Sequence, residues 1–521
     1  MSDVTGMHHS NPTPPADVES RPVDQSAFDT EPSSRGLSVS IVTLWLLLIV
    51  AGAYLRFEGL GVASLWRDEL CTWHVSRMAV GESLRWGPEL SKPPLYQFVL
   101  RGLTDDPHPS EWTLRLPAAV CGLLTILAAG WLGMICGGPI VGASLAGLLA
   151  FHDLQIEYSQ EARPYSLLVL GCTLSTALWY QLVTTRRRGY GLAYVLVTTL
   201  TLYAHYLAGL TVAAHFLWWV WRARRQITSP FHSAPFVSLI ATGLLSVPLV
   251  ARYLVFKTSL FQGLEWIKPP TLVTAFEVLE RLTFGWQWPV GLLLPAFVLW
   301  IAGAWGCRPR RFLRSAGPLF AGRDDPTGLL FSVFMTAWFG LLVLSWTAHP
   351  ALVPRYALPA AVPAILIPLL MANRFHRLAP TIVMVVFILG ALPSWTDREV
   401  DPGIREMVVF LEENMDAQRE AVVLTLDNTI YPGWEDSERI IFDYYPLRDA
   451  AVVELRLGPD GVTDVNQTLA DPRGLWVIVL WADPFPVLEA AGRRPIPIEL
   501  EGRSYSQLNF PPYRLVRVAP K

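Results

Sequence analysis

Stretches of apolar residues recur along the chain from Leu37 onward, and each is long enough to cross a hydrocarbon core of about 30 Å. The bilayer must therefore be the main solvent of the chain. Composition agrees, since 52% of the 521 residues are hydrophobic and only 16% are charged. The pattern predicts about eleven spans of roughly 17 to 22 residues, at 38–57, 114–136, 139–155, 164–184, 190–205, 207–222, 234–254, 288–306, 328–347, 355–373 and 379–394.

The short loops between these spans carry their basic residues on one side only. Arginine clusters follow predicted spans four, six, eight and ten: Arg186 to Arg188; Arg222, Arg224 and Arg225; Arg308, Arg310, Arg311 and Arg314; Arg374 and Arg377. Loops rich in Lys and Arg stay in the cytoplasm. We therefore expect a multi-pass protein of the cell inner (plasma) membrane, with a cytoplasmic N-terminus and an extracytoplasmic C-terminal domain.

Composition divides the chain into three parts. Residues 1–37 are rich in Ser, Pro, Asp and His and predict a disordered cytoplasmic tail. Residues 38–394 form the predicted transmembrane domain, whose first outer loop covers residues 58–113. Residues 395–521 follow the last span and are expected outside the membrane.

The C-terminal part has the patterns of a small α/β domain. A helical period runs from Gly403 to Met415, and β-branched runs at 421–426 and 475–480 predict two strands. The predicted fold class is an α-helical polytopic membrane protein with a small C-terminal α/β extracytoplasmic domain.

Charge and cysteine content exclude further classes. A net charge of −3 offers no basic face to a nucleic acid, so membrane lipid is the partner that composition implies. Only Cys71 of the five cysteines lies in a predicted outer loop, so no disulfide framework is expected.

The first polar motif on the predicted outer face is Trp66-Arg67-Asp68-Glu69. Paired acids beside an interfacial Trp can form a solvated acidic turn. They can also provide a carboxylate that accepts a proton from a hydroxyl, or hold a divalent cation beside a phosphate. The motif alone leaves both interpretations open.

A second motif, Lys92-Pro93-Pro94-Leu95-Tyr96, lies in the same loop. Its prolines fix an extended turn, which aims Lys92 and Tyr96 in defined directions. Lys92 is suited to pair with a lipid phosphate, and equally to extend along the membrane interface as a solvated cation.

Two further motifs pair an Arg with a Tyr where later spans begin. Glu161, Arg163 and Tyr165 lie at the start of span four, and Arg355 and Tyr356 open span ten. Each Arg could neutralise a neighbour and anchor its helix, or could bind an anionic headgroup through its planar donor fork. Because all four motifs fall on one face, their coincidence favours a site for a negatively charged lipid headgroup.

These motifs occur in the order of a known family. The chain resembles the bacterial relatives of dolichyl-phosphate-mannose-protein mannosyltransferases, the family 39 glycosyltransferases of the GT-C superfamily, which also contains the lipid A aminoarabinose transferases. The resemblance extends over roughly residues 38–375. It rests on the motifs at 66–69, 92–96, 114–117 and 158–165.

The resemblance implies a membrane enzyme that passes a sugar from a polyprenyl-phosphate-sugar donor to an envelope acceptor, usually with inversion. Asp68 would be the general base, and Glu69 would support it or contribute to a cation site. The resemblance implies that a second set of residues binds the donor: Lys92, Tyr96, Glu161, Arg163, Tyr165, Arg355 and Tyr356. Lys92, Arg163 and Arg355 would hold the phosphate, and the three tyrosines would line the pocket.

Lys92 departs from the family pattern, because most bacterial relatives carry His before the two prolines. Lys at this position resembles the aminoarabinose transferases, so the acceptor stays open between lipid, glycan and protein. The superfamily contains cation-dependent and cation-independent enzymes. No metal ligand or certain cofactor is therefore assigned, and a divalent cation stays open.

Two other functional classes compete with the enzyme. A lipid or solute transporter would need ionisable residues near the bilayer midplane, where the spans offer mainly His205 and His215. We expect both histidines to cap or pack helices. A non-catalytic polyprenyl-lipid-binding protein is the third class, and the intact Asp68, Arg163 and Arg355 argue against it.

Overall fold

The structure is a computed structural model of the whole chain. It describes residues 34–85, 92–223, 233–262, 267–283, 325–396, 403–416, 418–427, 440–447, 452–457, 473–480, 488, 494–500, 503–505, 507–510 and 513–520. The predicted tail up to residue 33 and predicted span eight, at 288–306, lie outside the described residues.

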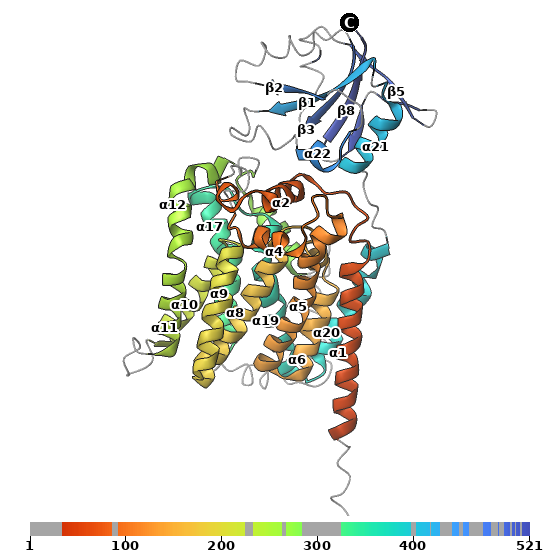
Figure 1. The fold of residues 1–521 in the computed structure, drawn as a ribbon. Coiled ribbons are helices and arrows are strands. Elements are labelled where there is room, and N and C mark those ends of the chain that lie inside the picture. The colour runs from red at the N-terminus through yellow and green to blue at the C-terminus, as the bar shows by residue number, and fades with distance from the viewer. Residues whose placement is uncertain are drawn as a thin grey trace, which may run out of the picture.

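A helical bundle forms the larger part of the molecule, and a small sheet domain lies above one end of it (Figure 1). Its first half comprises α1 Ser34–Phe57, α2 Arg67–Arg77, α3 Val80–Ser83, α4 Leu95–Leu103, α5 Glu111–Gly137, α6 Pro139–Ala150, α7 Asp153–Glu157, α8 Tyr165–Thr185 and α9 Arg188–Ala204. Its second half comprises α10 Ala208–Ala223, α11 Ala234–Leu245, α12 Val247–Gln262, α13 Leu272–Thr283, α16 Thr327–Phe334, π-helix η4 Met335–Phe339, α17 Gly340–Thr347, α18 Pro354–Ala357, 3-10 helix η5 Leu358–Ala360, α19 Ala361–Phe375 and α20 Ala379–Thr396.

The described helices confirm a polytopic membrane protein. Four helical segments are long and apolar enough to cross a bilayer, and they coincide with predicted spans two, four, nine and ten: Glu111–Gly137, Tyr165–Thr185, Thr327–Thr347 and Pro354–Phe375. Three shorter apolar helices coincide with spans one, three and eleven. Spans five and six coincide with α9 and α10, which have 17 and 16 residues. The full count of eleven therefore stays a prediction.

Two predicted boundaries differ from the helix ends, and one predicted span is broken. The helix of span one begins at Ser34, inside the predicted tail. Span three ends early, because α6 stops at Ala150 and His152 adopts an extended backbone before the short helix α7. Span seven is broken at Ser246, where α11 and α12 meet at a bend of 44°.

Glycine allows α5 and α6 to approach closely. Gly138 has a φ of +89°, a left-handed value that favours glycine, and it makes the turn between the two helices. At Gly142, an added Cβ would lie 2.6 Å from the backbone oxygen of Gly130. A larger residue there would push α5 and α6 apart.

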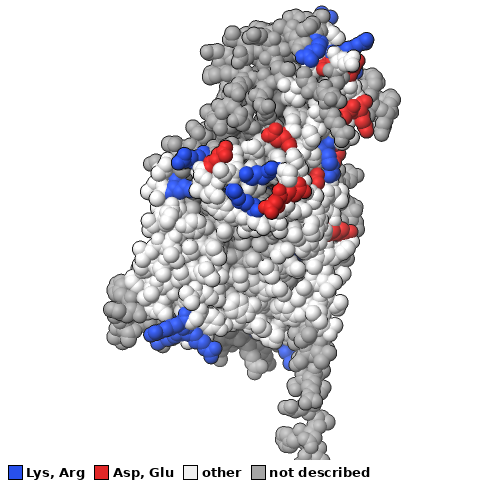
Figure 2. Space-filling model, viewed as in Figure 1, with Lys and Arg blue, Asp and Glu red and all other residues white. Residues whose placement is uncertain are grey.

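The surface of the bundle matches a lipid environment. Figure 2 shows a broad band of uncharged surface between a charged rim below the sheet domain and a basic patch at the opposite end. Leu192, Leu196 and Leu200 are exposed at four-residue spacing along α9, which is typical of a helix face that contacts lipid. Arg186 to Arg188 are exposed at the C-terminal end of α8.

The C-terminal domain confirms the predicted helix and strands. It contains α21 Ile404–Asn414, β1 Glu420–Asp427, α22 Ile440–Tyr444, β2 Val452–Leu457, β3 Gly474–Leu480, β4 Pro495–Ile496, β5 Ile498–Leu500, β6 Arg503–Tyr505, β7 Leu508–Phe510 and β8 Tyr513–Val518. The main sheet has the order β2-β1-β3-β8-β4. β1 pairs in parallel with β2 and β3, whereas β8 is antiparallel to its neighbours.

The core of this domain continues into the first outer loop. One apolar cluster contains Met407 of α21 and Trp476 of β3 together with Leu70 of α2, Leu100 of α4 and Leu114 of α5. The domain therefore packs directly on the loop that carries the first two motifs.

Candidate active site

Two neighbouring carboxylates in the first turn of α2 face different surroundings. Asp68 and Glu69 follow Trp66, whose backbone N–H donates to Glu69 Oε2 over 3.2 Å. Acids in a first turn are stabilised by the positive end of the helix dipole. The Glu69 side chain is completely buried, whereas 24% of the Asp68 side chain is exposed. Asp68 is thus the accessible carboxylate of the pair.

Glu69 is saturated by hydrogen bonds. Arg115 of α5 donates to both of its carboxylate oxygens, over 2.8 and 2.7 Å, and the Ala162 backbone N–H donates to Oε1 over 2.6 Å. Buried ions of this kind need such partners, since desolvation is costly. Glu69 therefore ties α2 to α5 and to the segment before α8, which fits the predicted supporting role. Acting as a cation ligand would require it to release Arg115.

Arg163 is pinned against α2. Its Nη1 donates to the Asp68 carbonyl over 2.5 Å and to the Thr72 hydroxyl, and its Nη2 lies 3.7 Å from Asp68 Oδ2. The Arg163 side chain is fully buried. The structure thus brings the third motif onto the first one, and Arg163 lies within ion-pair range of the Asp68 carboxylate.

Arg355 and Tyr356 complete this group from almost 300 residues away in the sequence. The Arg355 guanidinium carbon lies 5.9 Å from the Trp66 ring centre, which is cation–π range. The Tyr356 ring lies 6.3 Å from the Tyr165 ring. Three of the four motifs therefore meet at one end of the bundle, below the C-terminal domain.

Several polar atoms of this group are buried, and so is Tyr96 of the second motif, on which the charges of Glu69 and Glu161 act. Glu161 Oε2, Tyr96 Oη and Tyr165 Oη have no hydrogen-bond partner in the described part of the chain. Burial, and then the nearby carboxylates of Glu69 and Glu157, raise the pKa of Glu161 well above its usual value. Burial also raises the pKa of Tyr96 well above its usual value. Both shifts favour the protonated form, in which each side chain can donate a hydrogen bond.

Because burial raises the pKa of Glu161, the stability of the folded protein depends on whether this side chain is protonated. A carboxyl with a raised folded-state pKa holds its proton where the unfolded chain has lost it, so stability falls as pH rises from about 4.3 through the raised value. We expect Glu161→Gln, which mimics the protonated acid, to flatten this dependence in thermal unfolding between pH 5 and 8. Glu82→Gln is the matched control, because Glu82 is an exposed acid of the first outer loop. Equal pH profiles for wild type and Glu161→Gln would contradict the prediction.

Lys92 is half-buried and lies beside a cation that the motifs did not indicate. Arg252 Nη1 donates to the Lys92 carbonyl and to the Tyr206 hydroxyl, each over 3.2 Å. The bend at Ser246 starts α12, which carries Arg252 to the outer loop. The sequence does contain a signal for this cation, because Arg252 is a charged residue inside the apolar run of predicted span seven.

The two histidines behave as expected. His205 follows α9, and its Nδ1 accepts the Leu207 backbone N–H over 3.2 Å. Its ring also packs 5.8 Å from that of Tyr165, so it borders the site. His215 is buried between the hydroxyls of Thr176 and Tyr194, within the bundle.

The described residues contain no cluster of side chains suited to bind a metal ion. No group of three or more His, Cys, Asp or Glu side chains there could hold an ion.

Residues 91–251 match the family model of dolichyl-phosphate-mannose-protein mannosyltransferases. The predicted resemblance is confirmed over this segment. The match includes the motifs around Lys92 and Arg163, but it ends before Arg355 and begins after Asp68. It covers less than a third of the chain. No curated protein matches the chain.

Solved membrane glycosyltransferase structures are similar at low identity. ArnT from Cupriavidus metallidurans, bound to undecaprenyl phosphate, is 14% identical with a TM-score of 0.48, covering 93% of this chain and 98% of that one. The apo oligosaccharyltransferase of Archaeoglobus fulgidus is 10% identical with a TM-score of 0.49, covering 88% of this chain and 72% of that one.

Proposed function

We propose that this multi-pass membrane protein is a glycosyltransferase that moves a sugar from a polyprenyl-phosphate-linked donor to an envelope acceptor. The observation that carries the proposal is the accessible carboxylate of Asp68, which lies 3.7 Å from Nη2 of the buried Arg163, while Arg355 lies over the ring of the nearby Trp66. The family match over residues 91–251 supports a lipid-phosphate-linked sugar as donor, since that family is described by such a substrate.

The reaction is an inverting displacement at the anomeric carbon. Asp68 accepts the proton of the acceptor hydroxyl, whose oxygen then bonds to the anomeric carbon. The bond from that carbon to the phosphate oxygen breaks, and the polyprenyl phosphate leaves with the electron pair. Arg355, with Lys92 and Arg252, stabilises the charge that builds on the departing phosphate.

The site faces the extracytoplasmic side in this proposal. Helix α8 begins at Tyr165, in the site, and its other end is followed by the exposed Arg186 to Arg188. Loops rich in Lys and Arg stay in the cytoplasm, so the site is expected on the opposite side. The C-terminal domain is then extracytoplasmic, and the protein belongs to the inner (plasma) membrane.

Transfer of radiolabelled sugar tests the proposal. Membranes containing the protein would be supplied with a panel of polyprenyl-phosphate-linked sugars, and label would be followed into envelope lipid, glycan and protein fractions. Label transferred only in the presence of the protein supports the enzyme. Lipid-linked sugar that binds or crosses the membrane without being consumed supports the binding protein or the transporter instead.

The two arginines are expected to differ in their effect on the KM for the donor. Arg355→Ala should raise this KM about 10- to 100-fold, because it removes a cation that binds the donor phosphate, and it should also lower kcat, because the same cation stabilises the departing phosphate. Arg163→Ala should mainly lower kcat, because Arg163 holds Asp68. The family resemblance implied that both arginines bind the phosphate, and therefore weaker donor binding for both variants. Steady-state kinetics decide between the two, since an Arg163→Ala effect confined to KM would assign this residue to the phosphate.

A further inference from the structure

Residues 60–65, the segment that leads into α2, are held from the bundle side by one side chain. Arg115 Nη1 donates to the carbonyl oxygens of Leu60 and Ala63, over 3.0 and 2.7 Å, and Nη2 donates to that of Ser64 over 3.0 Å. The same guanidinium holds Glu69. All five of its N–H groups are thus used to fix this segment and the first turn of α2.

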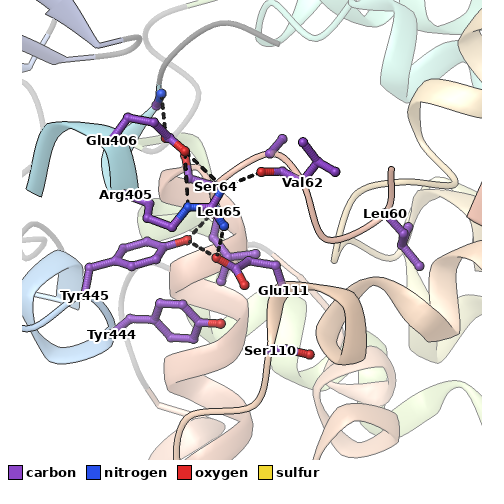
Figure 3. Close-up of polar contacts among 12 residues, drawn as sticks. Leu60, Val62, Ser64, Leu65, Ser110, Glu111, Arg405, Glu406, Tyr444 and Tyr445 are labelled. Carbon is purple, nitrogen blue, oxygen red and sulfur yellow. Dashed lines mark hydrogen bonds and ion pairs between the residues drawn. The ribbon is translucent and has the colours of Figure 1, made fainter. Parts of the chain in front are cut away.

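The C-terminal domain holds the same six residues from the other side. Arg405 of α21 donates to the Val62 carbonyl, and the Leu65 backbone N–H donates to Tyr445 Oη over 2.8 Å (Figure 3). Leu65 is fully buried, so its N–H has no access to water as a substitute partner.

Glu111, in the first turn of α5, joins the two sides. Its Oε1 accepts from the Tyr445 hydroxyl and from Arg405 Nη1, each over 3.0 Å (Figure 3). The two residues of the C-terminal domain therefore contact both the segment and the helix below it.

Apolar packing reinforces these polar contacts. The Trp73 ring of α2 meets the Tyr444 ring edge-on at 4.8 Å. At Gly403, an added Cβ would collide with the Ser64 hydroxyl, so the backbone of the domain lies directly against the segment.

From this geometry we propose that the C-terminal domain positions the catalytic carboxylate. Tyr445 and Arg405 are positioning residues that fix residues 60–65, and thereby the first turn of α2 with Asp68. Asp68 lies three residues beyond Leu65 in the chain and shares its helical turn with Glu69, which Arg115 locks to the same segment. The catalytic consequence rests on the proposed function, whereas the ordering of the segment does not.

Hydrogen–deuterium exchange of the full-length protein in lipid nanodiscs tests the ordering directly. Tyr445→Phe removes one hydroxyl and is expected to raise deuterium uptake in residues 60–72. Tyr444→Phe is the matched control, because its hydroxyl donates to the Pro109 carbonyl instead. Arg405→Ala should repeat the effect, Arg405→Lys should restore part of the protection, and Arg419→Ala, with a side chain 87% exposed, should have none. Unchanged uptake in both Tyr445→Phe and Arg405→Ala would overturn the proposal.

Turnover measures the consequence for Asp68. Since small displacements of catalytic groups cost up to about 100-fold, Tyr445→Phe should lower kcat by about 10- to 100-fold with little change in the KM for the donor. Higher exchange with unchanged kcat would overturn the positioning role. Absence of transfer by wild-type protein would instead reject the proposed function, and exchange at residues 66–72 would still decide whether the domain orders the turn of Asp68.

A disulfide lock provides a rescue. A Cβ at residue 403 would lie 3.5 Å from the Ser64 Cβ, within the range of disulfides. Ser64→Cys with Gly403→Cys should cross-link under oxidation, detected as a linked peptide by mass spectrometry. In the Tyr445→Phe background, this bond should restore low exchange and most of the lost kcat. A cross-linked variant that stays as slow as Tyr445→Phe would contradict positioning through this segment.

Discussion

Asp68→Asn is expected to lower the rate of sugar transfer by about 10²- to 10⁴-fold, which is the usual contribution of a general base. The amide keeps nearly the same shape and its carbonyl still accepts hydrogen bonds, but it cannot take a proton from the acceptor. The variant should fold and insert normally, because Asp68 is partly exposed and does not belong to the apolar core around Leu65 and Leu70.

Transfer from the best donor of the panel measures this effect, with gel filtration and thermal unfolding as tests of folding. Asp105→Asn is the matched control, because Asp105 is an exposed acid of the same outer loop. Wild-type turnover by Asp68→Asn would remove Asp68 from the role of base. Loss of activity in both variants would point to the charge of the loop as a whole.

Arg115→Ala is expected to lower the free energy of unfolding by about 3–5 kcal/mol, the loss typical of breaking a buried ion pair. The substitution leaves the Glu69 carboxylate buried with a charge and only two backbone partners. It also removes the donors for the three carbonyl oxygens of residues 60, 63 and 64.

Unfolding by titration with a denaturing detergent measures this loss. Arg281→Ala is the control, because its ion pair with Glu157 has the same 2.7 Å length but is 47% and 40% exposed. Exposed pairs of this kind contribute about 1 kcal/mol or less. Similar losses for the two variants would show that Glu69 is not buried as a charge.

Much of the fold and of the site was predictable, because lipid imposes a simple rule on long apolar segments. Hydropathy located the helices of spans two, four, nine and ten, and the basic loops defined one end of α8. The motifs around Asp68, Arg163 and Arg355 were expected on one face and do lie together. Their individual chemical roles stay predictions.

The rest depends on contacts between distant segments, which no local pattern encodes. Hydropathy does not locate the break at Ser246, since the helices on its two sides pass together as one apolar span, and so it does not show why Arg252 reaches Lys92. Arg115 stood in a recognised motif, but only the folded chain shows that it serves Glu69. Adjacent acids look equivalent in sequence, and only burial distinguishes Asp68 from Glu69.

The contact between Leu65 and Tyr445 joins residues 380 positions apart. At a synthesis rate of about 5–20 residues per second, the ribosome needs roughly 20–75 s to make the chain between them. For that time the first outer loop lacks the domain that covers it in the folded protein, so its apolar residues are available to chaperones and proteases. A chain truncated before residue 404 should therefore be recognised as immature by quality control even when its helices are correctly inserted.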